Sequence, residues 1–578
     1  MKAKKDIQVN EAQMGVSSWR FYLVAAMMLC VGLGVASRVV YLQVVDRDFL
    51  QVQGDKRVLR SEKIPAYRGI IQDRNEEPLA VSTPVTTVWA NPQKLIASQS
   101  QFPLLAKKLN TTESRLRDRV LRNQDKQFIY LRRHMSPHKA AEVLGLKMPG
   151  VHGLTEYRRY FPAGEVAAHI VGFVDIDENG QEGIELAYDE LLQGHPGKKR
   201  VVKDLHGRVV KDIGLIKNAE PGQNLSLSID LRAQYLAYKE LLTAVKEYKA
   251  SAGTVVAVDI DTGEILAMAN QPSYNPNNRS RKDVPNFRNR VVTDVFEPGS
   301  TVKPFTVAAA LESGKWKADS YINTSPGFLK VGSKRIRDMS NYGVIPVTTV
   351  ITKSSNVGAS KLALSLEPDA VADTFRRVGL GEATGIGFPG ESIGIMPFKE
   401  RWRPIEVATL SYGYGLSVTT LQLAQAYAVI GSGGIKRPLS LLKLEKPEEG
   451  VRVLSESVAS DVLTMLETVT AKGGTAKKAR VPGYRVAGKT GTVHKLSAMG
   501  YEDHRYLALF AGVAPVDDPQ IALVVVIDDP KGDEYYGGQV AAPVFSRVMS
   551  GLLRVKNVPP DRAPEQWVQV NKKPEPNI

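Results

Sequence analysis

Residues 253–270 read GTVVAVDIDTGEILAMAN. Apolar and β-branched residues lie on both sides of the Asp-Thr-Gly turn at 261–263, a pattern that predicts a β-hairpin. The stretch YLALFAGVAPVDDPQIALVVVID (506–528) predicts a second hairpin, and VFSRVMSGLLRVK (544–556) a closing helix. Before the first hairpin, residues 231–248 have helical spacing of apolar residues. Two hairpins around a long, largely helical middle predict an α+β domain with an antiparallel sheet.

An apolar run near the N-terminus predicts a membrane anchor at residues 21–45. The segment FYLVAAMMLCVGLGVAS is uncharged, and VVYLQVV continues it beyond Arg38. Together they supply the ~20 apolar residues that a spanning helix needs. Basic residues precede the run, so we expect residues 1–20 to stay in the cytoplasm and the rest to be exported. A cleaved signal peptide and a buried core helix are the alternatives; the length of the run and its lack of a polar face favour the anchor.

The length of the chain bears on its number of domains, and its net charge on the class of its partners. A chain of 578 residues indicates more than one domain, and a net charge of +15 suits nucleic acid, an anionic membrane or an acidic polymer, or is simply a basic surface. The only cysteine, Cys30, lies in the anchor, so the exported part has no disulfide. We expect a turn-rich pedestal module at 46–224, the α+β domain at 225–560 and a disordered tail at 561–578.

The α+β domain contains a serine at the start of a helix. In EPGSTVKPFTVAAALESG (297–314), Pro298-Gly299 predicts a turn and Gly314 the helix end. Ser300 and Lys303 are three residues apart and therefore share a helix face. An amine one turn from a hydroxyl can activate it without histidine. The positive end of the helix also favours the anion that develops during acyl transfer.

Two further motifs follow in the chain. Ser354-Ser355-Asn356 comes about fifty residues later, and Lys489-Thr490-Gly491 precedes the second hairpin. The order S-x-x-K, S-x-N, K-T-G is typical of active-serine penicillin-recognising enzymes. Other S-x-x-K pairs, at 136–139 and 440–443, lack this context, and an S-x-N at 273–275 precedes the serine.

Two other sequence patterns could indicate a different kind of site. Residues 483–490 match the P-loop pattern G-x-x-x-x-G-K-T, but a P-loop must open a helix, and the residues after Thr490 favour a strand. His134 and His138 are expected on one helical face, where a pair without a carboxylate neighbour indicates surface rather than a metal site. We expect no metal and no cofactor.

These motifs, with RGIIQDRN and GQEGIE in the pedestal and YGYGLSVTTLQLAQAYA (412–428), resemble the class B penicillin-binding proteins, and among them the division-specific branch of Gram-negative bacteria. The resemblance extends from the anchor to about residue 559. It implies a peptidoglycan D,D-transpeptidase of the inner membrane, with a periplasmic catalytic domain and β-lactams as inhibitors. It implies division-machinery membrane proteins as partners, including a septal glycosyltransferase, and no nucleic acid.

The resemblance also implies a role for each motif residue. Ser300 is the nucleophile and Lys303 its base, with the pKa of Lys303 lowered by repulsion from Lys489. Ser354 relays a proton to the leaving amine, and Asn356 orients Lys303. The remaining roles are those of substrate binding, by Lys489, Thr490, Gly491 and Thr492, and of the oxyanion hole, formed by the backbone N–H groups of Ser300 and Thr492.

The residues argue against a β-lactamase, a bifunctional synthase and a sensor, and leave a D,D-carboxypeptidase or a division scaffold as the alternatives. A class A β-lactamase needs a glutamate base with a downstream asparagine, and residues 357–556 contain no asparagine. A bifunctional synthase would need a glycosyltransferase domain, for which residues 46–221 are short. A D,D-carboxypeptidase would use the same three motifs. A scaffold for division proteins would not need all of them, and a penicillin sensor would need a larger cytoplasmic part.

Overall fold

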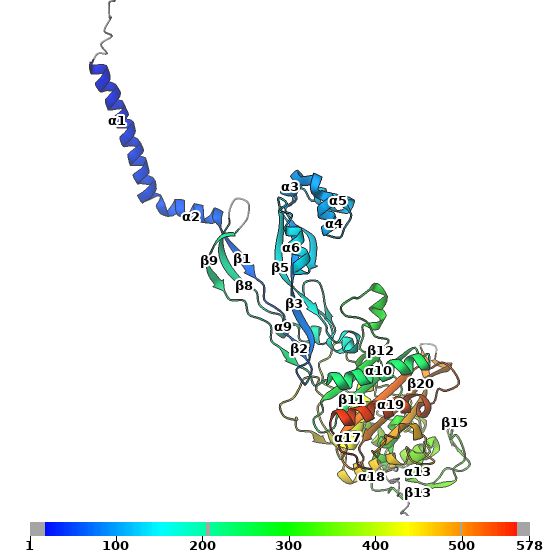
Figure 1. The fold of residues 1–578 in the computed structure, drawn as a ribbon. Helices are drawn as coiled ribbons and strands as arrows, with labels where there is room; N and C mark the ends of the chain where they lie inside the picture. The colour runs from blue at the N-terminus through cyan, green and yellow to red at the C-terminus, as the bar shows by residue number, and fades with distance from the viewer. Residues whose placement is uncertain (1–17, 204–208, 498–499, 563–578) are drawn as a thin grey trace, which may run out of the picture. The chain divides into compact units, whose positions relative to one another are not determined.

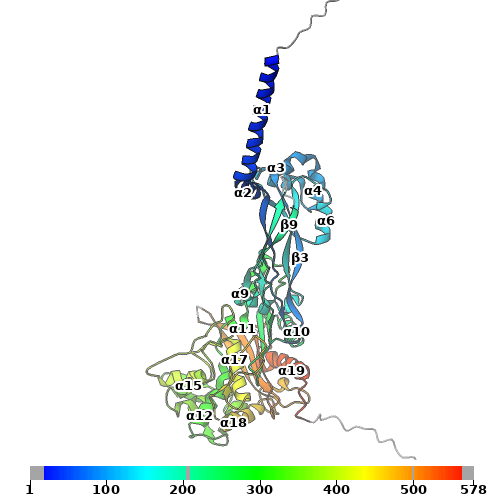
Figure 2. The ribbon, with the colours of Figure 1, turned by 90° about the vertical axis from the view of Figure 1, so that its left-hand side faces the viewer.

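The computed structural model describes residues 18–203, 209–497 and 500–562, and Figures 1 and 2 show it from two sides. Contacts divide the chain into two compact units. One comprises Met1–Ala66 with His195–Glu220, and the other Tyr67–Gly194 with Pro221–Ile578. Most of the expected cytoplasmic segment and of the expected disordered tail lies outside the described residues.

The first unit contains the apolar helix. Helix α1 (Ser18–Val40) continues as a π-helical segment (Tyr41–Val45) and is followed by α2 (Arg47–Val58). The 28-residue segment Ser18–Val45 contains an 18-residue stretch with a mean hydropathy of 2.1. Among the described residues it is the one helix that is long and apolar enough to cross a membrane. None of its side chains is buried, so the core-helix alternative is wrong and the helix fits a single-pass anchor. The unit also holds an antiparallel sheet of β1 (Leu59–Ile64), β8 (Gly197–Lys203) and β9 (Val209–Lys217).

The second unit begins with the pedestal sheet. Its longest strand, β3 (Pro78–Ala90), pairs with the three strands β2 (Ile71–Gln72), β4 (Ile129–Met135) and β5 (Val151–Tyr160). A fifth strand, β10 (Leu225–Ser226), pairs with β2 in parallel. The expected boundary at residue 224 therefore falls beside a strand of the pedestal sheet, and it stays a prediction.

Short helices complete the pedestal. One group packs on β3, β4 and β5 around a core of its own, which includes Val88, Phe102 and Val143. The helices of this group are α3 (Pro92–Leu95), α4 (Phe102–Lys108), α5 (Glu113–Leu121) and α6 (Pro137–Leu144). A second group follows β5 and consists of α7 (Ala168–Val171), β6 (Phe173–Val174), β7 (Gly180–Glu182), α8 (Gly183–Ala187) and α9 (Asp189–Leu192).

A buried ion cluster joins the two pedestal motifs noted in the sequence. Arg68 of RGIIQDRN and Arg159 of β5 each donate from Nε to one oxygen of Glu185, both at 2.6 Å. Arg68 also donates to Asp189 at 2.7 Å. Each buried cation thus has a carboxylate partner, which offsets the cost of removing it from water.

The α+β domain has the predicted antiparallel sheet, in the order β12-β11-β21-β20-β19. Both hairpins are confirmed. The first hairpin consists of β11 (Ala252–Asp259) and β12 (Ile265–Gln271), and the second of β20 (Gly500–Ala514) and β21 (Ile521–Asp528). The edge strand β19 (Ala487–Ser497) pairs with β20. Strand β11 and residues 521–527 of β21 are buried throughout, which explains why 252–259 and 521–527 are almost uniformly apolar.

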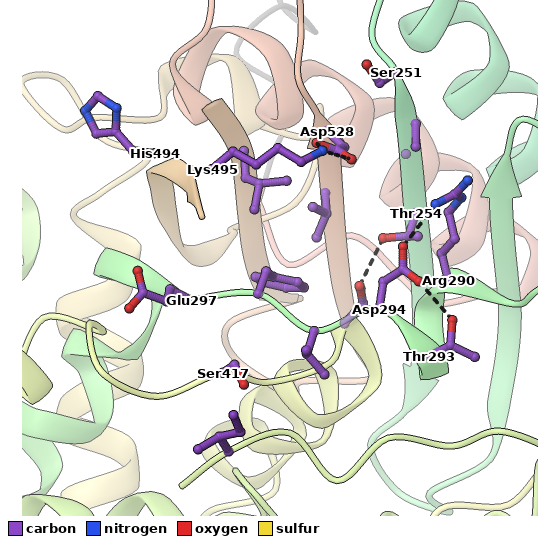
Figure 3. A pocket seen from close by; sticks show the side chains of 18 of the residues that line it. Ser251, Thr254, Arg290, Thr293, Asp294, Glu297, Ser417, His494, Lys495 and Asp528 are labelled. Atoms are coloured by element: carbon purple, nitrogen blue, oxygen red, sulfur yellow. Dashed lines mark hydrogen bonds and ion pairs between the residues drawn. The ribbon is translucent and has the colours of Figure 1, made fainter. Parts of the chain in front are cut away.

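Helices cover both faces of this sheet. Helices α10 (Leu231–Glu247) and α19 (Gly537–Val555) pack together on one face, and α17 (Thr420–Gly431) lies on the other (Figures 1 and 3). The helix predicted at 231–248 is confirmed. The closing helix begins earlier than predicted, since α19 starts at Gly537 and includes Pro543.

The rest of the domain is mainly helical. It comprises α11 (Arg290–Thr293), α12 (Lys303–Glu312), α13 (Val347–Thr352), α14 (Asn356–Leu364), α15 (Ala370–Arg377), α16 (Pro404–Leu410) and α18 (Glu456–Glu467). Three small hairpin-like pairs accompany them: β13 (Tyr321–Asn323) with β16 (Val344–Pro346), β14 (Phe328–Val331) with β15 (Lys334–Arg337), and β17 (Ile435–Lys436) with β18 (Val451–Arg452).

Candidate active site

Ser300 lies in a single 3-10 turn, Gly299–Val302, that leads directly into α12. Gly299 has a φ of +55°, and a Cβ there would lie 2.7 Å from Val493 of β19. The turn is held from outside by Tyr427 of α17, whose hydroxyl donates to the carbonyl of Thr301 at 2.8 Å. The predicted helix start is confirmed, and close contact with β19 explains why glycine precedes the serine.

Lys303 brings two of the motifs together. Its amine is fully buried and donates to the carbonyl oxygen of Ser354 at 2.6 Å and to Oδ1 of Asn356 at 2.7 Å. The hydroxyl of Ser354 lies 3.1 Å from the same nitrogen. A neutral amine has two N–H groups, so these two acceptors leave its lone pair free for a hydroxyl proton.

The pKa of Lys303 is lowered well below its ordinary value. Burial is the largest cause and the charge of Lys489 the second, while Asp338 acts in the opposite direction. The motifs predict repulsion from Lys489 as the cause of the lowered pKa of Lys303. In the structure, loss of hydration on burial contributes more. The structure thus favours the neutral amine that a base requires.

Asp338 is a functional residue that the motifs did not reveal. It accepts from the backbone N–H groups of Asn356 at 2.6 Å and Val357 at 3.0 Å, at the start of α14. Its second oxygen accepts from the hydroxyl of Ser355 at 2.6 Å. A carboxylate is favoured at a helix N-terminus, but nothing in the sequence spacing connects residue 338 with 355. Asp338 therefore positions the S-x-N loop, in which Ser354 has a φ of +59°.

Lys489 lies on β19, which overturns the P-loop alternative because no helix begins there. Its amine is fully buried and donates to the carbonyl oxygen of Thr490 at 3.1 Å. Burial lowers the pKa of Lys489 to about 7. A bound carboxylate would restore its charge, because an opposite charge favours the protonated form.

The remaining K-T-G residues have distinct surroundings. The hydroxyl of Thr490 is 3.0 Å from that of Thr475, and Oγ1 of Thr492 accepts from the N–H of Gly537 at 3.0 Å. A Cβ on Gly491 would lie 2.9 Å from the methyl of Thr301, next to Ser300. The glycine therefore lets β19 approach the nucleophile turn. Within the described residues β19 pairs only with β20, so its other edge is open to an extended peptide.

A cavity of about 1030 Å³ lies beside the nucleophile turn. It is lined by Phe296 and Glu297, by the 415–417 loop, and by the ends of β11 and β21 (Figure 3). The N–H of Gly415 donates to Glu297 at 3.0 Å, and Lys495 pairs with Asp528 at 2.7 Å. None of the five predicted catalytic residues lines it.

The prediction that His134 and His138 share a helix face is wrong. His134 belongs to β4 and His138 to α6, so they do not share a helix face. Among the described residues no group of three or more His, Cys, Asp or Glu could hold a metal ion. The extra S-x-x-K at 136–139 spans the start of α6 in the pedestal, apart from the other motifs.

The fold and the site define an active-serine, penicillin-recognising protein. Residues 253–550 match the penicillin-binding protein transpeptidase domain, and residues 63–227 the penicillin-binding protein dimerisation domain. The chain belongs to this family of penicillin-binding proteins.

Relatives of the chain are found both as whole proteins and as a separate transpeptidase domain. It is 47% identical over 549 residues to the peptidoglycan D,D-transpeptidase FtsI of Escherichia coli K12, covering 94% of this chain and 93% of the relative. The solved transpeptidase domain of Burkholderia pseudomallei penicillin-binding protein 3 is 42% identical, with a TM-score of 0.54, and covers 58% of this chain and 98% of its own. Penicillin-binding protein 3 of Mycobacterium tuberculosis, solved with aztreonam, is 27% identical, with a TM-score of 0.67, and covers 87% and 98%.

Proposed function

We propose that this protein is a peptidoglycan D,D-transpeptidase that cross-links stem peptides at the division septum. The observation that carries the proposal is the contact of the buried Lys303 amine with Ser354 and Asn356, one helical turn from Ser300. The names of the relatives point the same way, since the E. coli relative is a peptidoglycan D,D-transpeptidase.

The proposed acylation starts from the neutral Lys303 amine. Lys303 takes the proton of Ser300, and Ser300 Oγ attacks the penultimate D-Ala carbonyl of the donor stem peptide. The backbone N–H groups of Ser300 and Thr492 stabilise the oxyanion. The peptide C–N bond then breaks, and the proton reaches the leaving D-Ala nitrogen through Ser354. An ester remains on Ser300.

In the second half-reaction the amine of another stem peptide attacks this ester. Lys303, which is neutral again after acylation, takes a proton from this amine. The new amide forms, the ester C–O bond breaks, and Lys303 gives that proton to Ser300. Lys489, Thr490 and Thr492 hold the terminal carboxylate of the donor, with Lys489 protonated when that carboxylate is bound. Asn356 fixes the Lys303 amine, and Gly491 permits the close approach of β19.

We further propose an inner-membrane location with the N-terminus in the cytoplasm and the catalytic domain in the periplasm. The support is the single apolar helix with Lys2, Lys4, Lys5 and Arg20 before its apolar core. An anchor and a large pedestal suit assembly with division-machinery membrane proteins, including a septal glycosyltransferase. A D,D-carboxypeptidase remains the second candidate, since water can replace the acceptor amine.

The test is intact-protein mass spectrometry of the full chain after exposure to benzylpenicillin. The proposal expects one stable adduct on the wild type and none on Ser300→Ala. The carboxypeptidase alternative is then tested by supplying a stem pentapeptide with and without an acceptor amine. Exclusive hydrolysis in the presence of the amine would overturn transpeptidation, and absence of any adduct would overturn the active-serine site.

A further inference from the structure

A second charged cavity lies in the part of the pedestal that has its own core. We call residues 88–151 the head. Between the end of α4, strand β4 and the start of α6, the head has a cavity of about 630 Å³, the head groove. Its charged lining includes Lys107, Lys108, Arg132, Lys139 and Glu142. None of the active-site motif residues belongs to it.

The head groove has an excess of positive charge. Its one carboxylate, Glu142, is bonded to Lys108 at 2.6 Å. Over the described ranges, neither Lys107 nor Lys139 has a carboxylate within 4.0 Å, and both side chains are exposed. Arg132 donates to the carbonyl oxygen of Asn110 at 3.3 Å, which fixes its guanidinium against the end of α4. The cations come from three separate elements, so an extended anion can contact several of them at once.

The chemistry of the lining favours a polar, hydrated ligand. The only apolar residue in it is Met135, and its side chain is buried. A surface that binds a lipid bilayer places apolar side chains beside its basic ones, and here they are lacking. Lysine ammonium groups are strongly hydrated point charges that suit carboxylates in several orientations.

We propose that the head groove is a second binding site for peptidoglycan, which engages the free carboxylates of stem peptides. The proposal rests on the proposed function, because that function makes a carboxylate-bearing polymer the substrate. A polymer held by the head has a raised effective concentration at the catalytic domain of the same chain. The groove binds substrate and takes no part in bond making.

The experiment measures binding of the full-length, detergent-solubilised chain to purified cell-wall sacculi at increasing salt. All chains carry Ser300→Ala, so acylation cannot trap them. The test variant is Lys107→Glu with Lys139→Glu. The control is Arg115→Glu with Lys126→Glu, two exposed cations elsewhere in the head, which changes net charge by the same amount. A third arm uses sacculi whose carboxylates have been converted to amides.

The proposal expects the test variant to bind about tenfold more weakly at low salt, and the control to change less than about twofold. It also expects amidated sacculi to lose the difference between the two variants. Equal weakening of test and control would overturn it by showing adventitious surface charge. Loss of binding to vesicles of phosphatidylglycerol, with sacculus binding intact, would assign the groove to lipid instead.

A failure of the head-groove proposal can be distinguished from a failure of the proposed function. With Ser300 restored, the Lys107→Glu, Lys139→Glu chain is expected to form the benzylpenicillin adduct at the wild-type rate. An absent adduct in every chain would overturn the proposed function, whereas an adduct with unchanged sacculus binding would overturn the head groove alone.

Discussion

The pedestal and the catalytic domain both bury cations, but they surround them differently. In the pedestal, Arg68 and Arg159 share the carboxylate of Glu185. In the catalytic domain, Lys303 and Lys489 are fully buried, and across the described residues neither has a carboxylate within 4.0 Å. Arginine stays charged and needs a counter-ion, while lysine can lose its proton.

This difference indicates that the buried arginines stabilise the fold, whereas the buried lysines can take part in proton transfer. A paired buried arginine orders the chain around it, and its removal leaves an unpaired charge. A buried lysine without a counter-ion has a lowered pKa and can exchange protons near neutral pH. The predictions below test whether the two clusters behave in these opposite ways.

The largest effect is expected from Lys303→Arg. The substitution keeps the charge but removes a base, because guanidinium does not give up its proton. We expect the rate of acylation by benzylpenicillin to fall about a thousandfold or more. Stopped-flow measurement with a fluorescent penicillin checks this, with Lys315→Arg on the surface as control. Acylation at more than a tenth of the wild-type rate would contradict the assignment of Lys303 as base.

Opposite changes in stability are expected from Glu185→Gln and Lys489→Met. Glu185→Gln leaves two buried arginines short of a partner and is expected to lower the free energy of unfolding by about 3–5 kcal/mol. Lys489→Met is expected to raise it at neutral pH, because the native state no longer has to bury an amine that the unfolded state would protonate.

The expected change in the free energy of unfolding caused by Lys489→Met depends on pH. Its pKa is about 7 in the folded chain against an ordinary 10.5, so the unfolded state binds more protons between these values. The gain from Lys489→Met is therefore expected to be complete below pH 7, at most about 5 kcal/mol, and to decrease as the pH rises until it vanishes above pH 10.5. Denaturant unfolding at pH 7 and pH 10 measures it. A loss of stability at pH 7 would show that Lys489 is held as a paired cation.

Asp338→Asn is expected to have an intermediate effect. The S-x-N loop loses its anchor at α14, and the acylation rate is expected to fall by up to about a hundredfold. Because the charge of Asp338 raises the pKa of Lys303, its removal should shift the acidic limb of the rate profile to lower pH. Ser355→Ala keeps the charge and serves as control. A shift to higher pH, or none, would disprove this influence.

The smallest effect is expected from Thr475→Val. It removes the hydroxyl that contacts Thr490 at 3.0 Å, an interaction worth about 1 kcal/mol. We expect acylation to slow about two- to fivefold, as measured with the same fluorescent penicillin. Thr464→Val, on the exposed face of α18, should leave the rate unchanged, and an equal effect of both would remove the role assigned to Thr475.

The sequence predicted the parts of the structure that local patterns determine. Uniformly apolar strands and the turn at 261–263 predicted the sheet, and the ordered motifs predicted the contact of Lys303 with Ser354 and Asn356. Contacts between distant segments were not predictable. Asp338 has no motif spacing to reveal it, and the packing of Gly491 against Thr301 depends on how β19 approaches the nucleophile turn.

The predictions for the two histidines and for the start of α19 were wrong because of local features of the chain. His134 lies in strand β4, which runs to Met135, and helix α6 starts only at Pro137, so the spacing of the two histidines does not place them on one helix. The sequence pattern predicts the closing helix from residue 544, whereas α19 starts at Gly537 and includes Pro543. Burial could not be quantified from the sequence, which is why repulsion from Lys489 was named as the cause of the lowered pKa of Lys303.

The most direct test of the central claim is the pH dependence of Ser300 acylation in the wild-type chain, from pH 5 to pH 10. If Lys303 is a neutral base, the rate should rise with a single acidic limb well below 10.5 and be high at pH 7. A limb near pH 10 would show that Lys303 is protonated at neutral pH, and would contradict the claim that an unpaired buried lysine activates the serine.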